Sequence, residues 1–142
     1  TFKRIADVKR LEAYQFVAAL NCVLAQRLVR TVCDDCKHPV TISNEVLQES
    51  AINPERINGR TIYEGAGCME CGGTGYKGRT AICELLDLTD DIREMILDKR
   101  PTSEIKNAAR LTGMRFLRES AVQQVLCGRT TLREINKVTF IE

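Results

Sequence analysis

The stretch CMECGGTGYKGRT, at residues 68–80, contains a Cys-x-x-Cys pair followed by closely spaced glycines. A second pair, CDDC, lies upstream at residues 33–36. Two residues between cysteines let one tight turn direct both thiolates at a single ion, and two such turns supply the four sulfurs that zinc prefers. Four protein ligands leave no open position for water. We therefore predict a structural Zn²⁺ ion bound by Cys33, Cys36, Cys68 and Cys71.

Residues 37–67 separate the two pairs, which is a longer insert than the roughly 15–20 residues of a compact zinc ribbon. We expect this insert to fold as its own small lobe. A redox Cys-x-x-Cys, disulfides and an iron–sulfur cluster are alternatives that spacing alone leaves open. His38 could replace one sulfur, but with four cysteines available we interpret it as a bystander. The remaining cysteines are interpreted as core thiols: Cys22, Cys83 and Cys127.

The flanking segments predict a mainly α fold with a small β element. Apolar residues recur at helical spacing over residues 9–30, which predicts one long N-terminal helix that ends near Val32. A short helix is predicted at 41–51 with Ser43 as N-cap, and short strands at 60–63 and 79–88. Four short helices follow, the first capped by Thr89 and the last by Thr131. The predicted domains are 1–32, a tetracysteine zinc lobe at 33–88, and a C-terminal helical bundle at 89–142.

Composition narrows the classes of function. The 142 residues are 44% hydrophobic and 28% charged, which is typical of a globular protein. A net charge of +2 with 5% aromatic residues argues against a nucleic-acid-binding surface. No apolar run approaches the ~20 residues of a membrane-spanning helix. We find no nucleophile beside a base and no nucleotide-binding loop, so no catalytic or cofactor-binding residue is predicted. Seven cysteines that include two Cys-x-x-Cys pairs are typical of metal ligands in a reducing compartment, so we expect a cytoplasmic protein.

Four motifs together resemble a known family. They are LAQRLVR at residues 24–30, GCMECGGTGYKGRT at 67–80, ICELL at 82–86 and GMRFLRE at 113–119. Their order and spacing are similar to those of the secretion-type ATPases, the AAA-like assembly ATPases of type II secretion and type IV pilus machines. The resemblance extends from about residue 4 to residue 139.

The resemblance implies a cytoplasmic hexameric motor at the cytoplasmic face of the inner membrane, without insertion into it. Its implied partners are the inner-membrane platform protein and neighbouring subunits, and not nucleic acid. Residues 1–32 would be the helical end of the ATPase core, followed by the inserted zinc lobe. ATP and Mg²⁺ would bind only in the full-length protein, because the Walker A, Walker B, Asp and His motifs of the family are not among these residues.

Several expectations follow for the fragment itself. Thr1 is not a methionine, so we expect a piece of a longer protein that is not an enzyme by itself. Arg10 and Ala13 stand where the family commonly has Gly and Pro, which leaves the conformation of residues 1–15 open. Arg27 and Arg30 would contact nucleotide, a neighbouring subunit, or simply carboxylates in surface ion pairs.

Two other functions use the same motifs. A nucleic-acid-binding zinc ribbon is suggested by the zinc turns and the basic residues between Lys3 and Arg10. A DnaJ-type chaperone zinc module is suggested because Cys68-x-x-Cys71-x-Gly73-x-Gly75 matches its repeat. That module carries four such repeats, whereas the upstream pair here lacks the glycines.

Overall fold

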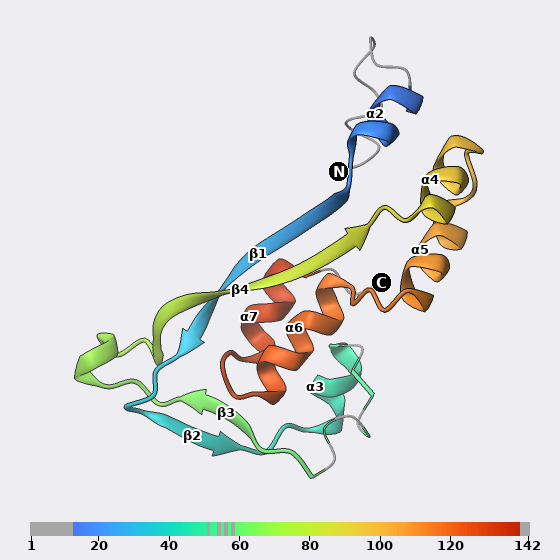
Figure 1. Ribbon diagram of the computed structural model, residues 1–142. Coiled ribbons are helices and arrows are strands. Elements are labelled where there is room, and N and C mark those ends of the chain that lie inside the picture. The colour runs from blue at the N-terminus through green and yellow to red at the C-terminus, as the bar shows by residue number, and fades with distance from the viewer. Residues whose placement is uncertain (1–12, 51, 54, 56, 58, 140–142) are drawn as a thin grey trace. The chain divides into compact units, whose positions relative to one another are not determined.

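The computed structural model describes residues 13–139 apart from 51, 54, 56 and 58. These residues form two compact units. One contains the described residues up to Leu24 together with Leu85–Arg115, and the other contains Ala25–Glu84 together with the described residues from Phe116 onward. Figure 1 labels the elements in chain order. The division into domains 1–32, 33–88 and 89–142 stays a prediction.

The predicted long N-terminal helix, and with it the mainly α fold class, is wrong. The chain forms a short helix, α2 (Ala13–Ala19), and then a long strand, β1 (Cys22–Val32), while residues 9–12 lie outside the described part. The residues that the structure describes are about 40% helix and 26% strand, with two small antiparallel sheets. Leu24 and Leu28, which the helical interpretation placed on a buried stripe, are 57% and 58% exposed.

Strand pairing explains why this segment is extended. β1 pairs with β4 (Tyr76–Asp87), and the two arrows in Figure 1 run in opposite directions. The β-branched residues of β1, among them Val29 and Val32, favour an extended backbone, and both are only 2% exposed. Their burial depends on a partner strand distant in sequence, so tertiary pairing overrides the local helical spacing.

A second sheet forms in the insert between the cysteine pairs. β2 (Lys37–Val40) pairs antiparallel with β3 (Ile62–Gly65), with Lys37 opposite Gly65 and Val40 opposite Ile62. The helix α3 (Asn44–Glu49) follows β2, and the Ser43 side chain accepts a hydrogen bond from the Val46 N–H, as predicted for its N-cap.

Two C-terminal helices complete this unit and close its core. They are α6 (Leu117–Leu126) and α7 (Leu132–Val138), and α7 is capped by Thr131, whose side chain accepts from the Glu134 N–H. The Arg118 guanidinium of α6 donates to the Ser50 carbonyl after α3 and to the Thr139 hydroxyl after α7. The core is aliphatic, as expected from the scarcity of aromatic residues, and its buried members are Val29, Leu47, Ile52, Ile62, Ile82, Ala121, Val122, Val125, Leu132 and Ile135.

The other unit is mostly helical. It contains α2, α4 (Asp90–Leu97) and α5 (Thr102–Leu111), and α2 packs against α4. Thr89 caps α4 by accepting from the Ile92 N–H, as predicted. Val17, Leu88 and Ile92 are each at most 3% exposed and form its interior. Within the part of the chain that the structure describes, no helix has the length and apolar composition to cross a bilayer.

Candidate metal centre

The four predicted ligands converge at one place. The first pair lies on the turn between β1 and β2, and the second lies on η2 (Met69–Cys71) and its N-terminal neighbour, between β3 and β4. The Sγ atoms of Cys33, Cys36, Cys68 and Cys71 all lie within 4.8 Å of one another. Pairing of β2 with β3 brings the two ends of the insert together, and with them the two cysteine pairs.

The sulfur spacing fits a tetrahedral zinc ion. The Cys33–Cys68 and Cys36–Cys71 Sγ separations are both 3.9 Å, and Cys68–Cys71 is 3.7 Å. A Zn–S bond of about 2.3 Å implies tetrahedral sulfur separations of about 3.8 Å. None of the three separations is near the ~2.05 Å of a disulfide bond. The donor set and its dimensions therefore suit a four-thiolate zinc site.

Backbone N–H groups point at two of the sulfurs. The Gly67 N–H donates to Cys36 Sγ over 3.3 Å, and the N–H groups of Cys68 and Gly75 donate to Cys71 Sγ over 3.2 Å each. Such bonds stabilise a thiolate and fix the direction of its lone pairs. These N–H groups therefore favour the thiolate form of the two sulfurs that accept from them.

Two glycines make this packing possible. A Cβ atom on Gly65 would clash with the Gly75 carbonyl group, and a Cβ on Gly75 would clash with the Gly65 carbonyl oxygen. Gly75 also has φ of 76°, a conformation that other residues rarely adopt. The strand before the second cysteine pair and the chain after it can therefore approach closely only because neither residue has a side chain.

The surroundings of Cys33, Cys36 and Cys71 change the pKa of these thiols in different directions. Burial raises the pKa of Cys33 to about 12 and also raises that of Cys36. The N–H of Cys68, followed by that of Gly75, lowers the pKa of Cys71 to about 6. Cys71 therefore carries charge near neutral pH, while Cys33, which is fully buried, needs a bound cation to favour its thiolate form.

The other candidate ligands lie elsewhere. His38 is exposed on β2, and its Nδ1 lies 3.5 Å from the Cys36 carbonyl oxygen rather than in the sulfur cluster. The interpretation of the three remaining cysteines as core thiols needs correction. Cys22 is exposed on β1 and Cys127 is exposed after α6, while Cys83 is half-buried on β4.

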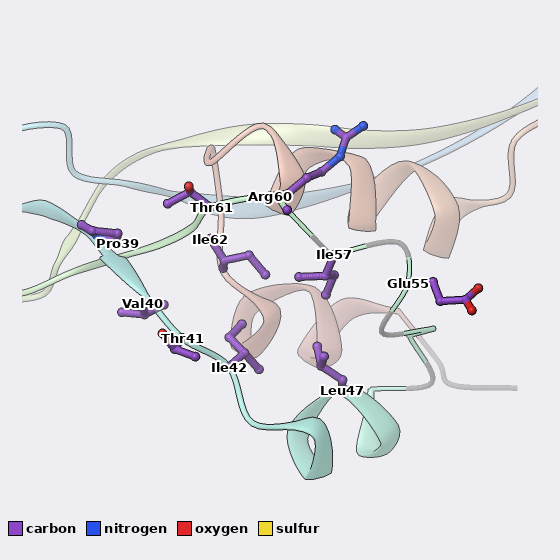
Figure 2. Close-up of a pocket in the computed structure, with 11 residues that line it drawn as sticks. Pro39, Val40, Thr41, Ile42, Leu47, Glu55, Ile57, Arg60, Thr61 and Ile62 are labelled. Carbon is purple, nitrogen blue, oxygen red and sulfur yellow. The ribbon is translucent and has the colours of Figure 1, made fainter.

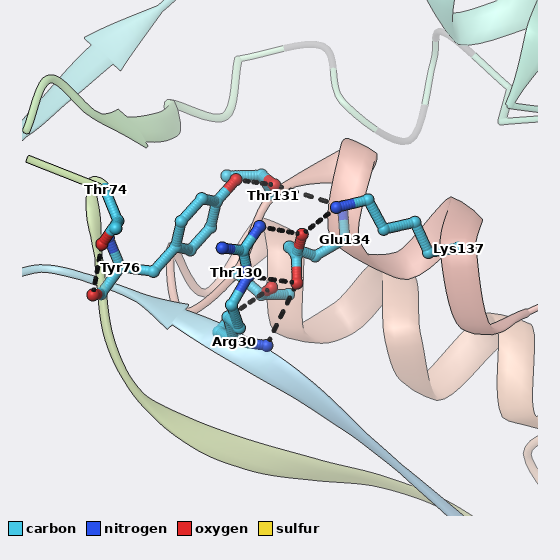
Figure 3. A network of polar contacts seen from close by, with 7 residues as sticks. All are labelled: Arg30, Thr74, Tyr76, Thr130, Thr131, Glu134 and Lys137. Atoms are coloured by element: carbon cyan, nitrogen blue, oxygen red, sulfur yellow. Dashed lines mark hydrogen bonds and ion pairs between the residues drawn. The ribbon is translucent and has the colours of Figure 1, made fainter.

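A polar network that the sequence did not reveal joins Arg30 of β1 to the start of α7 (Figure 3). The Arg30 guanidinium donates to both carboxylate oxygens of Glu134, over 2.7 and 2.9 Å, and lies 4.1 Å from the centre of the Tyr76 ring. Lys137 also contacts Glu134. These bonds lower the pKa of Glu134 to about 2, the Arg30 bond being the largest cause. Arg30 is thus paired with a carboxylate, whereas Arg27 is exposed and donates to its neighbour's carbonyl oxygen.

The insert also has an open hollow of about 700 Å³ (Figure 2). Aliphatic side chains of Ile42, Leu47, Ile57 and Ile62 line it, and the first three of these residues lie between β2 and β3. Leu47 and Ile62 are members of the hydrophobic core, and Ile42 and Ile57 pack against it. The hollow therefore lies at the edge of the hydrophobic core.

Comparisons with known proteins agree with the motifs. The family model "Type II/IV secretion system protein" matches residues 2–137. The type IV pilus assembly ATPase PilB of Thermus thermophilus is 46% identical over 129 residues, which are 91% of this chain and 14% of the relative. The type II secretion system protein E of Dickeya dadantii is 38% identical over 130 residues, or 91% of this chain and 25% of the relative.

A PilB from Myxococcus xanthus is 36% identical over 126 residues, covering 88% of this chain and 22% of the relative. The chain thus spans about a quarter or less of the length of these curated relatives. The family match covers almost all of it, including both cysteine pairs and the C-terminal helices. The resemblance seen in the sequence is confirmed, and the chain belongs to the type II/IV secretion system protein family.

Proposed function

We propose that these residues form the zinc-binding and C-terminal helical part of a motor ATPase that drives type II secretion or type IV pilus assembly. The observation that carries this proposal is the convergence of four Sγ atoms within 4.8 Å, in a chain that belongs to this family. The role of this part is structural and interactive. ATP and Mg²⁺ bind in other parts of the whole motor, and these residues do not hydrolyse ATP by themselves.

The zinc ion has a structural role in this proposal. Cys33 and Cys36 hold it from the β1–β2 turn, while Cys68 and Cys71 hold it from the loop before β4. When bound, zinc supplies a redox-inert cation that neutralises thiolate charge and crosslinks the two segments. The backbone N–H groups of Gly67 and Gly75 orient the sulfurs.

The metal content of the purified chain tests the site. We expect about one zinc per chain by elemental analysis, and loss of zinc in Cys68→Ser. The matched control is Cys127→Ser, which removes an exposed thiol outside the cluster and should retain the metal. Zinc absent from a folded wild-type chain, or retained equally in both variants, would contradict the proposed ligand set.

The whole motor would act as a hexamer at the cytoplasmic face of the inner membrane, against the machine's platform protein. Its family membership supports this placement. The contribution of the zinc lobe is tested by capture of the chain on the platform's cytoplasmic domain. We expect weaker capture of Cys68→Ser than of wild type and Cys127→Ser. Equal capture of all three proteins would remove the zinc lobe from the interface.

A further inference from the structure

The turn before α7 contacts the end of β1, next to the first cysteine pair. The Val32 N–H donates to the Arg129 carbonyl oxygen over 2.9 Å. The Thr130 hydroxyl donates to the Arg30 carbonyl oxygen over 2.8 Å, and Thr130 is fully buried. Two hydrogen bonds therefore join the end of β1, just before Cys33, to the turn just before α7.

Tyr76 joins the second cysteine pair to the same turn. Its neighbour Gly75 accepts a hydrogen bond from the Cys33 N–H over 3.0 Å and donates to Cys71 Sγ. The Tyr76 hydroxyl lies 3.0 Å from the hydroxyl oxygen of Thr131, the N-cap of α7. Tyr76 thus connects Gly75, which contacts two of the predicted ligands, to the cap of α7.

The Arg30–Glu134 pair strengthens this connection. Arg30 lies over the Tyr76 ring and binds Glu134 through two parallel hydrogen bonds, as Figure 3 shows. Glu134 is in the first turn of α7 and is 5% exposed. Paired, partly desolvated charges of this kind have one preferred geometry, so movement of Tyr76 or Arg30 disturbs the start of α7.

We propose that metal occupancy of the cysteine cluster and the docking of the start of α7 are energetically coupled through Tyr76. The inference rests on the proposed metal site. Without the metal, the loop at Gly75 is held by fewer bonds, and Tyr76 loses its fixed position against Thr131 and Arg30. Coupling is reciprocal, so if bound metal strengthens the docking of α7 by some factor, docking of α7 strengthens metal binding by that same factor.

The test uses the 142-residue chain and three proteins: wild type, Tyr76→Phe and Tyr14→Phe. Tyr76→Phe keeps the ring beneath Arg30 and removes only the hydroxyl, while Tyr14 is 66% exposed and serves as the matched control. Zinc affinity is measured by competition with a chromophoric chelator. We expect Tyr76→Phe to bind zinc roughly fivefold more weakly, the factor expected for one lost hydrogen bond, and Tyr14→Phe to match wild type.

Hydrogen exchange supplies the second measurement. In wild type, removal of zinc should accelerate exchange at α7 amides such as Ile135 by at least roughly tenfold, with little change at Val125 in the core of α6. Equal acceleration at both amides would indicate general unfolding and overturn the coupling.

The remaining outcomes separate the two proposals. Suppose that the chain binds one zinc ion. If hydrogen exchange in α7 is then unchanged by zinc removal, or if Tyr76→Phe and wild type bind zinc equally well, the coupling is overturned and the zinc site is retained. A chain that binds no zinc overturns both.

Discussion

Replacing Glu134 by Gln should cost more stability than any change to an exposed ion pair of this chain. The Glu134 side chain is 7% exposed and accepts two hydrogen bonds from the Arg30 guanidinium, one from the Arg30 backbone N–H and one from Lys137. Glu134→Gln keeps the shape but removes the charge and turns an amide NH₂ group toward a guanidinium. The matched control is Glu104→Gln, in an Arg100–Glu104 pair whose side chains are 56% and 43% exposed.

The magnitude follows from the pKa of Glu134. Its fall from 4.5 to about 2 on folding corresponds to about 3 kcal/mol at 1.36 kcal/mol per pKa unit. Arg30 is 43% exposed, so solvent screening reduces this figure, and we expect about 2 kcal/mol. The Arg100–Glu104 pair is exposed and joins a residue before α5 to the first turn of that helix, so it should contribute about 0.2–1 kcal/mol.

The pH dependence has a defined sign. The folded-state pKa of Glu134 is depressed, so its stabilisation is complete above pH 4.5 and is lost as the pH falls toward about 2. Urea unfolding of zinc-loaded protein at pH 7 should show the full difference between wild type and Glu134→Gln, and that difference should shrink in this acid window. A carboxyl pKa near 4.5 by NMR, or a difference at pH 7 no larger than that of Glu104→Gln, would refute the reasoning.

Three further substitutions test the packing by urea unfolding. Gly75→Ala should lower the free energy of unfolding by more than about 3 kcal/mol and weaken zinc binding, because its Cβ meets the backbone of another segment. The control Gly59→Ala has open space around it and should cost about 1–2 kcal/mol and leave zinc bound. Equal costs in the two variants would contradict the close approach of Gly65 and Gly75. Ile135→Ala should cost about 2–5 kcal/mol at a fully buried site, and Leu111→Ala, 89% exposed, should stay within about 0.5 kcal/mol. Thr89→Ala removes the N-cap of α4 and should cost about 1 kcal/mol, and an unchanged unfolding midpoint would show that this cap is dispensable.

The elements predicted correctly are those specified by neighbouring residues. Ser43, Thr89 and Thr131 each cap a helix through a backbone N–H three residues further on. The strand predicted at 79–88 appears as β4, somewhat longer at its start. For the caps, the atoms that interact are close in the chain, and for β4 the alternation of side chains along the segment is itself local, so a short stretch of sequence contains the relevant information.

The N-terminal helix was mispredicted for the opposite reason. Leu24 and Leu28 have helical spacing, but the extended conformation of β1 is stabilised by pairing with β4. The local pattern could not indicate that partner, and the gain from strand pairing and from burial of Val29 exceeds any local helical preference. The Arg30–Glu134 pair was missed likewise, since its members are 104 residues apart.

The sequence alone determined the four candidate ligands, because two Cys-x-x-Cys turns are local structures that each present two sulfurs. The resemblance of its motifs to known ATPases indicated the family. Only the tertiary structure decided that the four sulfurs lie within 4.8 Å of one another, that the segment before Cys33 is a strand, and that Arg30 meets Glu134. These features depend on β2–β3 pairing and on the packing of α7. In both, segments that are distant in sequence bury apolar surface against each other, and this burial stabilises them.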